Sequence, residues 1–278
     1  MRGHSPSSAS SREPLQVRRL ITIDDESSRC PVTGIGNDWT RAYYDGPFHL
    51  FELPTGRPAV SLVFVQSRNG NTAAGNPSDL GGGPTDKHLI YEGLSRVAAD
   101  GVLAGAATVG HSVFFTVKHP QLVELRRDLG LPRHPVQIVL SERGELDFSA
   151  RVFSTPDVPV LILAGERCAR RCSLEVQRRP WITIVPTNGD LVATLITLRR
   201  DYGIQRISAV GGRHAATSLV DAGLVQDIYL TTTAIDAGEP NTPWYVGLAP
   251  PVVSPIVRKR EDTTERPILF EHLAIKSA

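Results

Sequence analysis

The sequence is poor in cysteine, in lysine and in long apolar runs, and these shortages exclude several protein classes. Three cysteines in 278 residues are too few for a disulfide framework. No apolar run approaches the roughly 18 residues that a membrane-spanning helix needs, and the N-terminus lacks the apolar core of a signal peptide. We therefore expect a cytoplasmic protein with reduced cysteines and no membrane partner.

Net charge is also nearly absent. A formal net charge of +1 provides no general attraction to nucleic acid, so we expect no nucleic-acid partner. Lysine occurs only four times, and arginine supplies most of the positive charge, which we attribute to genome composition. Cys168 and Cys172 lie four residues apart in a predicted helix. We interpret them as a reduced, partly buried pair, with a metal site as the weaker alternative.

One stretch, Arg206 to Gly223, organises the rest of the chain. The β-branched run Ile207 to Val210 meets the glycine pair Gly211-Gly212, and an apolar-periodic segment follows and ends at Gly223. This order predicts a strand, a tight turn, a helix and its C-cap. The unsatisfied backbone N–H groups and the positive dipole end of such a helix favour anionic oxygens. A plain tight turn is the alternative for the glycine pair taken alone.

Apolar runs predict an α/β fold with about eight strands. The expected strands cover residues 59–66, 101–105, 136–141, 158–164, 181–185, 207–210, 224–235 and 268–275. Helical patterns fall between most of them, near residues 85–99, 122–129, 166–178, 191–202 and 213–222. Strands that alternate with helices indicate a mainly parallel sheet, and the last two strands, with no clear helix between them, indicate an antiparallel edge.

The chain is expected to hold one domain with two N-terminal additions. Residues 1–14 are rich in Ser, Arg and Pro and should be disordered. Residues 15–57 form an extension with several aromatic side chains, which should pack over the core or a neighbouring subunit; a substrate lid is the alternative. Residues 58–278 form the main domain.

Several motifs, taken in chain order, resemble a known family. Gly105-Ala-Ala-Thr-Val109, Gln137-Ile-Val-Leu-Ser141, Val210-Gly-Gly-Arg213 and Leu224-Val-Gln-Asp-Ile-Tyr-Leu-Thr231 are similar to successive signatures of the dihydrofolate-reductase superfamily. Ser67-Arg-Asn-Gly70, Gly83-Pro-Thr-Asp86, Leu94-Ser-Arg-Val-Ala-Ala-Asp100 and Asp221-Ala-Gly-Leu-Val-Gln-Asp227 resemble its riboflavin-biosynthesis branch, the pyrimidine reductase domain of bifunctional deaminase-reductases. The resemblance covers about residues 58–275, and no zinc-deaminase signature accompanies it.

The resemblance implies a homodimeric reductase that uses NADPH. The pyrophosphate would lie on the glycine turn and the following helix start, and Ser141 with Arg143 would suit the adenosine 2′-phosphate. An ordinary turn cap is the alternative for Ser141, and a solvated surface charge for Arg143. We also expect a cis peptide between Gly211 and Gly212. The cofactor-binding residues that the resemblance implies are Gly105, Ala107, Thr108, Val109, Ser141, Arg143, Gly211, Gly212, Arg213, His214 and Ala215.

The substrate side departs from the family pattern. Positions that are commonly acidic in the family hold Asn69, His111 and Val210 here. A protonated or amino-bearing pyrimidine would lose charge-assisted hydrogen bonds at these positions, each worth about 1.5–3 kcal/mol. We name Asn69 and His111 as candidate catalytic residues, although a hydrogen-bonded side chain at a helix start is the alternative for His111 and for His214. The candidate substrate-binding residues are Asn69, Thr72, Ser78, Arg96, Lys118 and Val210.

Arg96 and Lys118 fall where the family has cations that face a substrate phosphate, with a helix-surface charge as the alternative for Arg96. The implied reaction is hydride transfer to an imine or carbonyl linked to a heterocycle. An NADPH reductase of another heterocycle, such as a dihydrofolate-like pterin, and a non-catalytic nucleotide-binding homologue remain open. A Rossmann dehydrogenase is disfavoured, because no Gly-x-Gly-x-x-Gly follows the first strand of the main domain.

Overall fold

The computed structural model describes residues 17–262 and 265–276. Its strands are β1 (Leu20–Asp25), β2 (Val32–Ile35), β3 (Phe48–Phe51), β4 (Ala59–Gln66), β5 (Gly101–Gly105), β6 (Val136–Ser141), β7 (Val160–Ala164), β8 (Ile182–Pro186), β9 (Arg206–Val210), β10 (Val225–Thr232), β11 (Val252–Glu261) and β12 (Leu269–Lys276). Its longer helices are α1 (Asp38–Tyr43), the π-helix η3 (Thr85–Leu94), α3 (Pro120–Asp128), α4 (Glu166–Gln177), α5 (Leu191–Tyr202) and α6 (Arg213–Asp221). A short helix, α2 (Ser95–Val97), continues η3, and the predicted disorder of residues 1–14 lies outside the described part.

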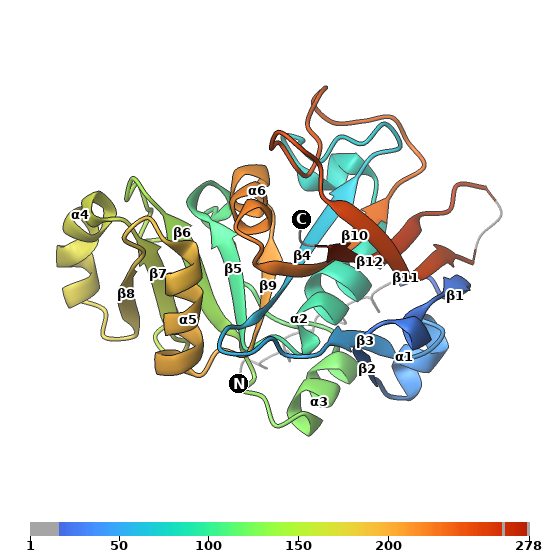
Figure 1. Ribbon diagram of the computed structural model, residues 1–278, viewed down its shortest axis with the longest axis horizontal. Helices are drawn as coiled ribbons and strands as arrows, with labels where there is room; N and C mark the ends of the chain where they lie inside the picture. The colour runs from blue at the N-terminus through green and yellow to red at the C-terminus, as the bar shows by residue number, and fades with distance from the viewer. Residues whose placement is uncertain (1–16, 263–264, 277–278) are drawn as a thin grey trace, which may run out of the picture.

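One ten-stranded sheet runs across the whole molecule, from β8 beside α4 to β1 at the opposite end (Figure 1). Its order is β1-β11-β12-β10-β4-β9-β5-β6-β7-β8. The strands from β10 to β8 are parallel, and β12, β11 and β1 add an antiparallel edge. The expected α/β fold with an antiparallel edge is therefore confirmed. Because parallel strands end on the same side, the carboxyl ends of β4, β9 and β5 lie next to one another.

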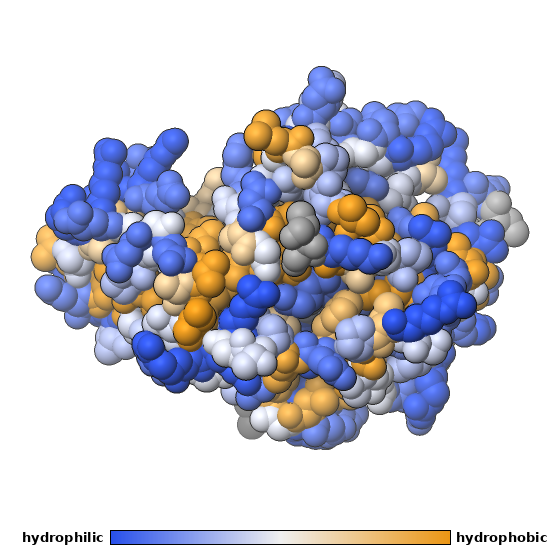
Figure 2. Space-filling view, viewed as in Figure 1, coloured by the Kyte–Doolittle hydropathy of each residue, from blue (hydrophilic) through white to orange (hydrophobic). Residues whose placement is uncertain are grey.

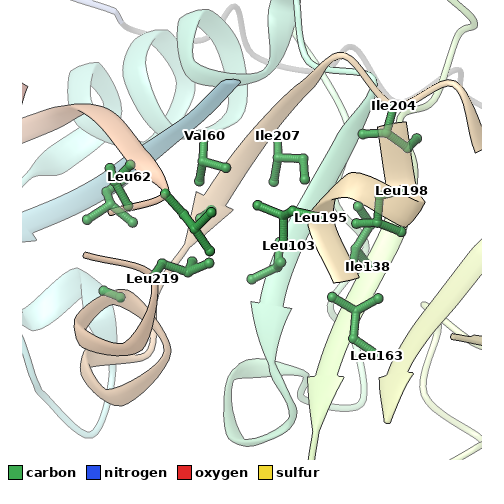
Figure 3. Packing of buried hydrophobic residues seen from close by; sticks show 14 of the residues in the cluster. Val60, Leu62, Leu103, Ile138, Leu163, Leu195, Leu198, Ile204, Ile207 and Leu219 are labelled. Atoms are coloured by element: carbon green, nitrogen blue, oxygen red, sulfur yellow. The ribbon is translucent and has the colours of Figure 1, made fainter. Parts of the chain in front are cut away.

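Both faces of the sheet are covered, and the strand alternation explains the two layers. On β4, Val60 and Leu62 face one side, where Leu195 and Leu198 of α5 and Leu219 of α6 pack on them and their neighbours (Figure 3). Val63 faces the other side and packs with η3. Since each buried Leu contributes about 1.5–3 kcal/mol, the apolar runs in the parallel strands account for much of the stability.

A buried polar network fixes the register of the antiparallel edge. The carboxylate of Asp227 on β10 accepts from Ser61 Oγ on β4 at 2.7 Å and contacts His272 Nε2 on β12 at 2.6 Å. His272 and Asp227 are both buried. Buried polar groups need such partners. A register slip of one residue in either strand would leave the Asp227 carboxylate buried without its hydrogen-bond partners.

The N-terminal extension packs on the core through its aromatic side chains. Tyr44 and Phe48 are buried in the cluster that η3 shares with β10 and β12. β1 joins the main sheet beside β11, and β2 pairs with β3 in a separate two-stranded sheet. The buried Lys259 on β11 donates to Thr22 Oγ1 at 2.7 Å and to the carbonyl of Asp45 at 3.2 Å, which ties the extension to the sheet.

Eight strands were expected, and the structure adds four. Each of the eight predicted runs overlaps an observed strand, and each helical pattern overlaps an observed helix, although residues 85–94 are a π-helix. The four unexpected strands are β1, β2, β3 and β11. They are short or polar, and β11 contains Pro255 and the charged run Arg258 to Glu261, so apolar periodicity does not reveal them.

The surface in one view is mixed in hydropathy. Figure 2 shows hydrophilic residues over α4 at one end and apolar residues gathered between that end and the middle of the molecule. No helix in the described residues is long and apolar enough to cross a bilayer. Cys168 and Cys172 are free and buried in α4, with their sulfur atoms 3.9 Å apart, as expected for a reduced pair.

Candidate functional site

The Gly211-Gly212 turn links the end of β9 to the start of α6. Both glycines have positive φ angles, 67° and 82°, which residues with a side chain rarely adopt. The expected cis peptide between them is wrong: all peptide bonds in the described residues are trans. The two positive φ angles turn the chain sharply enough without a cis bond. The predicted strand-turn-helix unit itself is present.

The first turn of α6 has free backbone donors. Gly212 is its N-cap residue and provides no side-chain hydrogen bond, although its carbonyl accepts from Ala216 N at 3.0 Å. The N–H groups of Arg213, His214 and Ala215 therefore have no intrahelical acceptor. They lie at the positive end of the helix dipole, a typical site for an anionic oxygen.

Thr108 lies directly against the glycine pair. A Cβ built on Gly211 would lie 3.1 Å from Thr108 Cγ2, and one on Gly212 would lie 3.4 Å from Thr108 Oγ1. At the end of β5, a Cβ on Gly105 would lie 3.9 Å from Ala215 Cβ. The structure thus brings together five of the predicted cofactor residues at the carboxyl ends of β9 and β5. The small residues keep the backbone open to a close-lying ligand, so this cradle fits a dinucleotide phosphate.

The other predicted cofactor residues surround this cradle or lie farther along the same edge. Ala107 and His214 are exposed, Arg213 is half-buried, and Val109 packs partly into the core. At the end of β6, Ser141 is buried and its Oγ accepts from Gly144 N at 3.1 Å, which is the turn cap that we considered as its alternative role. Arg143 is exposed, so its guanidinium is accessible from solvent.

Asn69 and Thr72 follow β4 and are held by the loop after β10. Asn69 Oδ1 accepts from Ser67 Oγ at 2.5 Å, and Ser67 Oγ also contacts the carbonyl of Ala237 at 2.9 Å. Thr72 donates through both N and Oγ1 to the carbonyl of Thr242, each at 2.8 Å. These contacts position the two side chains at the same sheet edge as the cradle, two strands away from β5.

Three further predicted site residues, His111, Val210 and Ser78, lie on other segments of the chain. His111 is exposed and faces Asp147 and Ser149, with 3.5 Å between its Nδ1 and each partner oxygen. Val210 is fully buried in the core, and Ser78 is exposed on the loop before η3. The structure therefore does not bring Asn69 and His111 into contact, and their catalytic roles stay predictions.

A large groove, with a volume of about 1270 Å³, lies between η3 and the segment 112–121. Arg96 and Lys118 both line it, so the structure brings these two predicted substrate cations together. Arg96 is buried, and its guanidinium is stacked between Tyr91 and Phe115, at 4.2 Å and 5.4 Å from the ring centroids. Burial lowers the pKa of Arg96. Arg96 and Lys118 together provide two basic side chains in the groove.

Glu92 organises the polar groups of the groove. Its carboxylate accepts from Lys118 Nζ at 2.6 Å and contacts His88 Nδ1 at 2.9 Å. The Glu92 side chain is only 8% exposed, whereas that of Lys118 is 49% exposed. Lys118 is thus an accessible ammonium fixed in place from below.

Asp86 is a site residue to which sequence analysis assigned no role. It is buried at the start of η3, and burial raises its pKa to about 6, while the hydroxyl of Thr231 on β10 opposes that rise. Asp86 forms no ion pair among the described residues. Thr231 pairs with Val65 near the end of β4, so Asp86 lies close to the edge that holds Asn69 and the glycine cradle. A buried carboxylate with a raised pKa is typical of functional sites.

The only sequence signal for Asp86 was its place in Gly83-Pro-Thr-Asp86, where an acidic residue in a first helical turn has an ordinary explanation. Its burial depends on Gly82, since a Cβ there would lie 2.8 Å from Asp86 Cβ. No group of three or more metal-ligating side chains occurs within residues 17–262 and 265–276. The arrangement therefore offers an anion cradle, an uncompensated carboxylate and a cationic groove.

Comparisons with known proteins give a family and a fold. A family model described as the RibD C-terminal domain matches residues 58–264, and no curated protein matches the chain in sequence. A pyrimidine reductase-like protein from Corynebacterium diphtheriae superposes with a TM-score of 0.65 at 18% identity, covering 80% of this chain and 93% of that one.

Two longer proteins share the fold. RibD from Acinetobacter baumannii has a TM-score of 0.65 at 17% identity, and the match covers 80% of this chain and 59% of that one. A deaminase/5-amino-6-(5-phosphoribosylamino)uracil reductase from Thermotoga maritima has a TM-score of 0.59 at 16% identity, covering 86% and 59%. At such identities the likeness shows the fold alone. Because the family model matches well over half of its residues, the chain belongs to the RibD C-terminal domain family.

Proposed function

We propose that this chain is an NADPH-dependent reductase that resembles the 5-amino-6-(5-phosphoribosylamino)uracil reductase of riboflavin biosynthesis. The observation that carries the proposal is the cradle of Gly211, Gly212 and Thr108 at the open N-terminus of α6. Family membership supports an oxidoreductase of this type. NADP specificity, a homodimeric state and a small heterocyclic substrate are parts of the same proposal.

The cradle would hold the pyrophosphate through backbone donors. The N–H groups of Arg213, His214 and Ala215 supply positive partial charge, and Thr108 Oγ1 adds a hydroxyl from the facing turn. Arg143 is the candidate for the adenosine 2′-phosphate because its guanidinium is accessible and can donate two parallel hydrogen bonds. Bound NADPH would supply a hydride from its nicotinamide C4.

The protein's own task is to orient and shield the hydride acceptor. An imine or carbonyl carbon attached to a heterocycle accepts the hydride, and its nitrogen or oxygen takes a proton. Asn69 lies at the edge of the sheet beside the cradle and could orient that acceptor through its amide. His111, three residues after Thr108 in the chain, is the second candidate from sequence analysis.

Asp86 favours a second substrate class within the same reaction type. Three positions that are commonly acidic in the family pattern hold Asn69, His111 and Val210 in this chain. Asp86 instead provides one buried carboxylate, which suits a heterocycle that presents a protonated ring nitrogen or an amino group, as a dihydropterin does. A non-catalytic nucleotide-binding homologue is the remaining alternative.

NADPH oxidation, followed by the loss of nicotinamide absorbance, tests the proposal. Purified protein is given a ribosylaminopyrimidine, a dihydropterin or neither, with NADH as the cofactor control. Turnover with the first supports the riboflavin-pathway reaction, and turnover with the second supports the alternative. NADPH binding without turnover of either would contradict the enzymatic proposal and support the non-catalytic one, and absence of NADPH binding would refute the cradle's assignment.

A further inference from the structure

The turn after β4 presents Asn69 beyond the end of the neighbouring strand β9. Val63 of β4 pairs with Val210, the last residue of β9, and β4 continues to Gln66. At about 3.3 Å per residue, β4 therefore extends roughly 10 Å past the point where the glycine turn of the cradle begins. Asn69 is exposed there. A ligand that follows the sheet edge from the cradle reaches its side chain.

This turn is closed by its own backbone and tied to the loop after β10. Ser67 N donates to the carbonyl of Asn71 at 3.0 Å, and Gly70 N donates to the carbonyl of Ser67 at 2.9 Å. Gly70 has a φ of 82°, which allows the chain to reverse. Arg68 forms an ion pair with Asp236 of the facing loop. The backbone of the turn is thus fixed before any ligand binds.

The buried amide of Asn71 can lie only one way round. Its Nδ2 donates to the carbonyl of Ala237 at 3.1 Å, and a backbone carbonyl can only accept. Its Oδ1 accepts from Thr242 N at 3.4 Å. The second hydrogen of Nδ2 points to the side chain of Asn69, at 3.1 Å. The Asn69 atom that faces Asn71 is therefore the amide oxygen.

The orientation of Asn71 determines which half of the Asn69 amide is free. Asn69 Oδ1 accepts from both Asn71 Nδ2 and Ser67 Oγ, so the protein occupies the oxygen. Asn69 Nδ2 has no acceptor among the described residues, and its two hydrogens face outward. A free asparagine can offer a donor or an acceptor to a ligand, whereas this one offers only a donor.

We propose that Asn69 Nδ2 donates to a ring carbonyl oxygen of the substrate, so that the chain selects an oxo-heterocycle and rejects one with an amino group at the same position. A ring amino group would place two donors against each other and leave both without an acceptor. This selectivity rests on the proposed function, since its ligand is the heterocycle of the reductase substrate. The carbonyl is distinct from the amino group or protonated nitrogen that would face Asp86.

Binding of three small rings tests the selectivity without any turnover. The probes are pteridine-2,4-dione, 2-aminopteridin-4-one and pteridine-2,4-diamine, which form two pairs that each differ by one exchange of an oxo for an amino group. Their fluorescence is titrated with the full chain at pH 7 under saturating NADP⁺, which carries no hydride to transfer. In at least one pair the wild type should bind the oxo member about fivefold or more tightly than the amino member.

Two variants and a matched control assign that preference to the amide. Asn69→Asp replaces the outward nitrogen by an oxygen and keeps the inner oxygen on its donors, so the preference within that pair should reverse. Asn71→Ala frees the Asn69 amide to turn over, and the preference should fall below about twofold while both rings still bind. Asn188→Asp makes the same charge change in an exposed turn after β8, at the far end of the sheet, and should keep the wild-type preference. If Asn71→Ala does not fold, Asn69→Asp still decides the outcome, because its side chain is exposed.

The outcomes for the selectivity and for the proposed function are separable. Wild-type protein that shows no preference for the oxo member of either pair, or that binds none of the rings, would overturn the selectivity, and so would an unchanged preference in Asn69→Asp. NADPH turnover combined with any of these results leaves the proposed function standing. A preference that reverses in Asn69→Asp, in a protein that turns over no substrate, supports the selectivity and counts against the proposed reaction.

Discussion

Replacing Asp86 by Asn should stabilise the protein above pH 6 while reducing its activity. The folded protein buries the Asp86 carboxylate with no ion pair among the described residues, and burial raises its pKa from 3.8 to about 6. Ionised Asp86 therefore destabilises the fold, and the neutral amide of Asn has nearly the same shape. A residue that costs stability and supports function is expected at a ligand-binding site.

The size and sign of the effect follow from the pKa. The rise in the pKa of Asp86 from 3.8 to about 6 corresponds to about 3 kcal/mol, since each tenfold change in the ionisation constant is worth about 1.36 kcal/mol. Between pH 6 and pH 4 the folded state keeps the proton that the unfolded state has lost, so wild-type stability rises as the pH falls through this window. Above pH 6 the full cost is present. Asp86→Asn should thus be up to about 3 kcal/mol more stable at pH 8, with a difference that shrinks toward zero near pH 4.

Urea unfolding at pH 4, 6 and 8 measures this difference, and NADPH oxidation measures the loss of activity. Asp79→Asn is the matched control, because Asp79 is an exposed carboxylate on the loop before η3, and its replacement should change neither quantity. A variant that is no more stable than wild type at pH 8, or that gains the same amount at pH 4 and pH 8, would refute the claim that Asp86 is desolvated. Unchanged turnover of the variant would show that Asp86 has no role in the reaction.

Three further predictions concern the cradle and the core. Gly211→Ala should weaken NADPH binding at least tenfold in calorimetry, because the new Cβ would crowd Thr108. Gly203 is the matched control, since it has the same φ of 67° and open space around it. Gly203→Ala should destabilise the protein but leave NADPH binding unchanged. Arg126→Met should lower the unfolding free energy by roughly 3 kcal/mol in urea, since the buried guanidinium donates to four backbone carbonyls that would lose their partner. Burial lowers the pKa of Lys259 to about 8, so wild-type stability should rise between pH 8 and pH 10 as the folded state sheds that proton first; Lys259→Met should lack this rise.

The parallel part of the fold was predictable because its signals are local. A strand buried on both faces needs a continuous apolar run, and each of β4, β5, β6 and β7 has one. The edge strand β1 and its neighbour β11 lack such a run, since β1 ends in two aspartates and β11 ends in the charged residues Arg258 to Glu261. Their pairing joins residues more than 200 positions apart. Nothing in the local sequence of either strand specifies that partner.

In the candidate site, too, only the features with a local sequence signal could be predicted. The Gly211-Gly212 turn could be predicted because a glycine's backbone freedom is visible in the sequence, and the structure confirms the turn and its helix. The prediction of a cis bond was wrong, because the choice between cis and trans depends on how β9 meets α6. Ser141 also shows the limit: its hydroxyl caps the Gly144 turn, which a strand-end serine does without any ligand.

Asp86 and Arg96 show most clearly what a sequence hides. On the sequence they are an acidic residue in the first turn of a helix and a basic residue ten positions later, which is the ordinary charge distribution of a solvated helix. The structure buries both, yet no ion pair joins them, and neither finds a counter-ion elsewhere among the described residues. Ten residues separate them along η3 and α2, and neither neutralises the other. Each buried charge costs stability, and a hydrophobic residue at either position would be the cheaper solution for folding alone. The pair is therefore best explained by ligands: a hydrogen-bond donor or cation at Asp86, and an anion at Arg96.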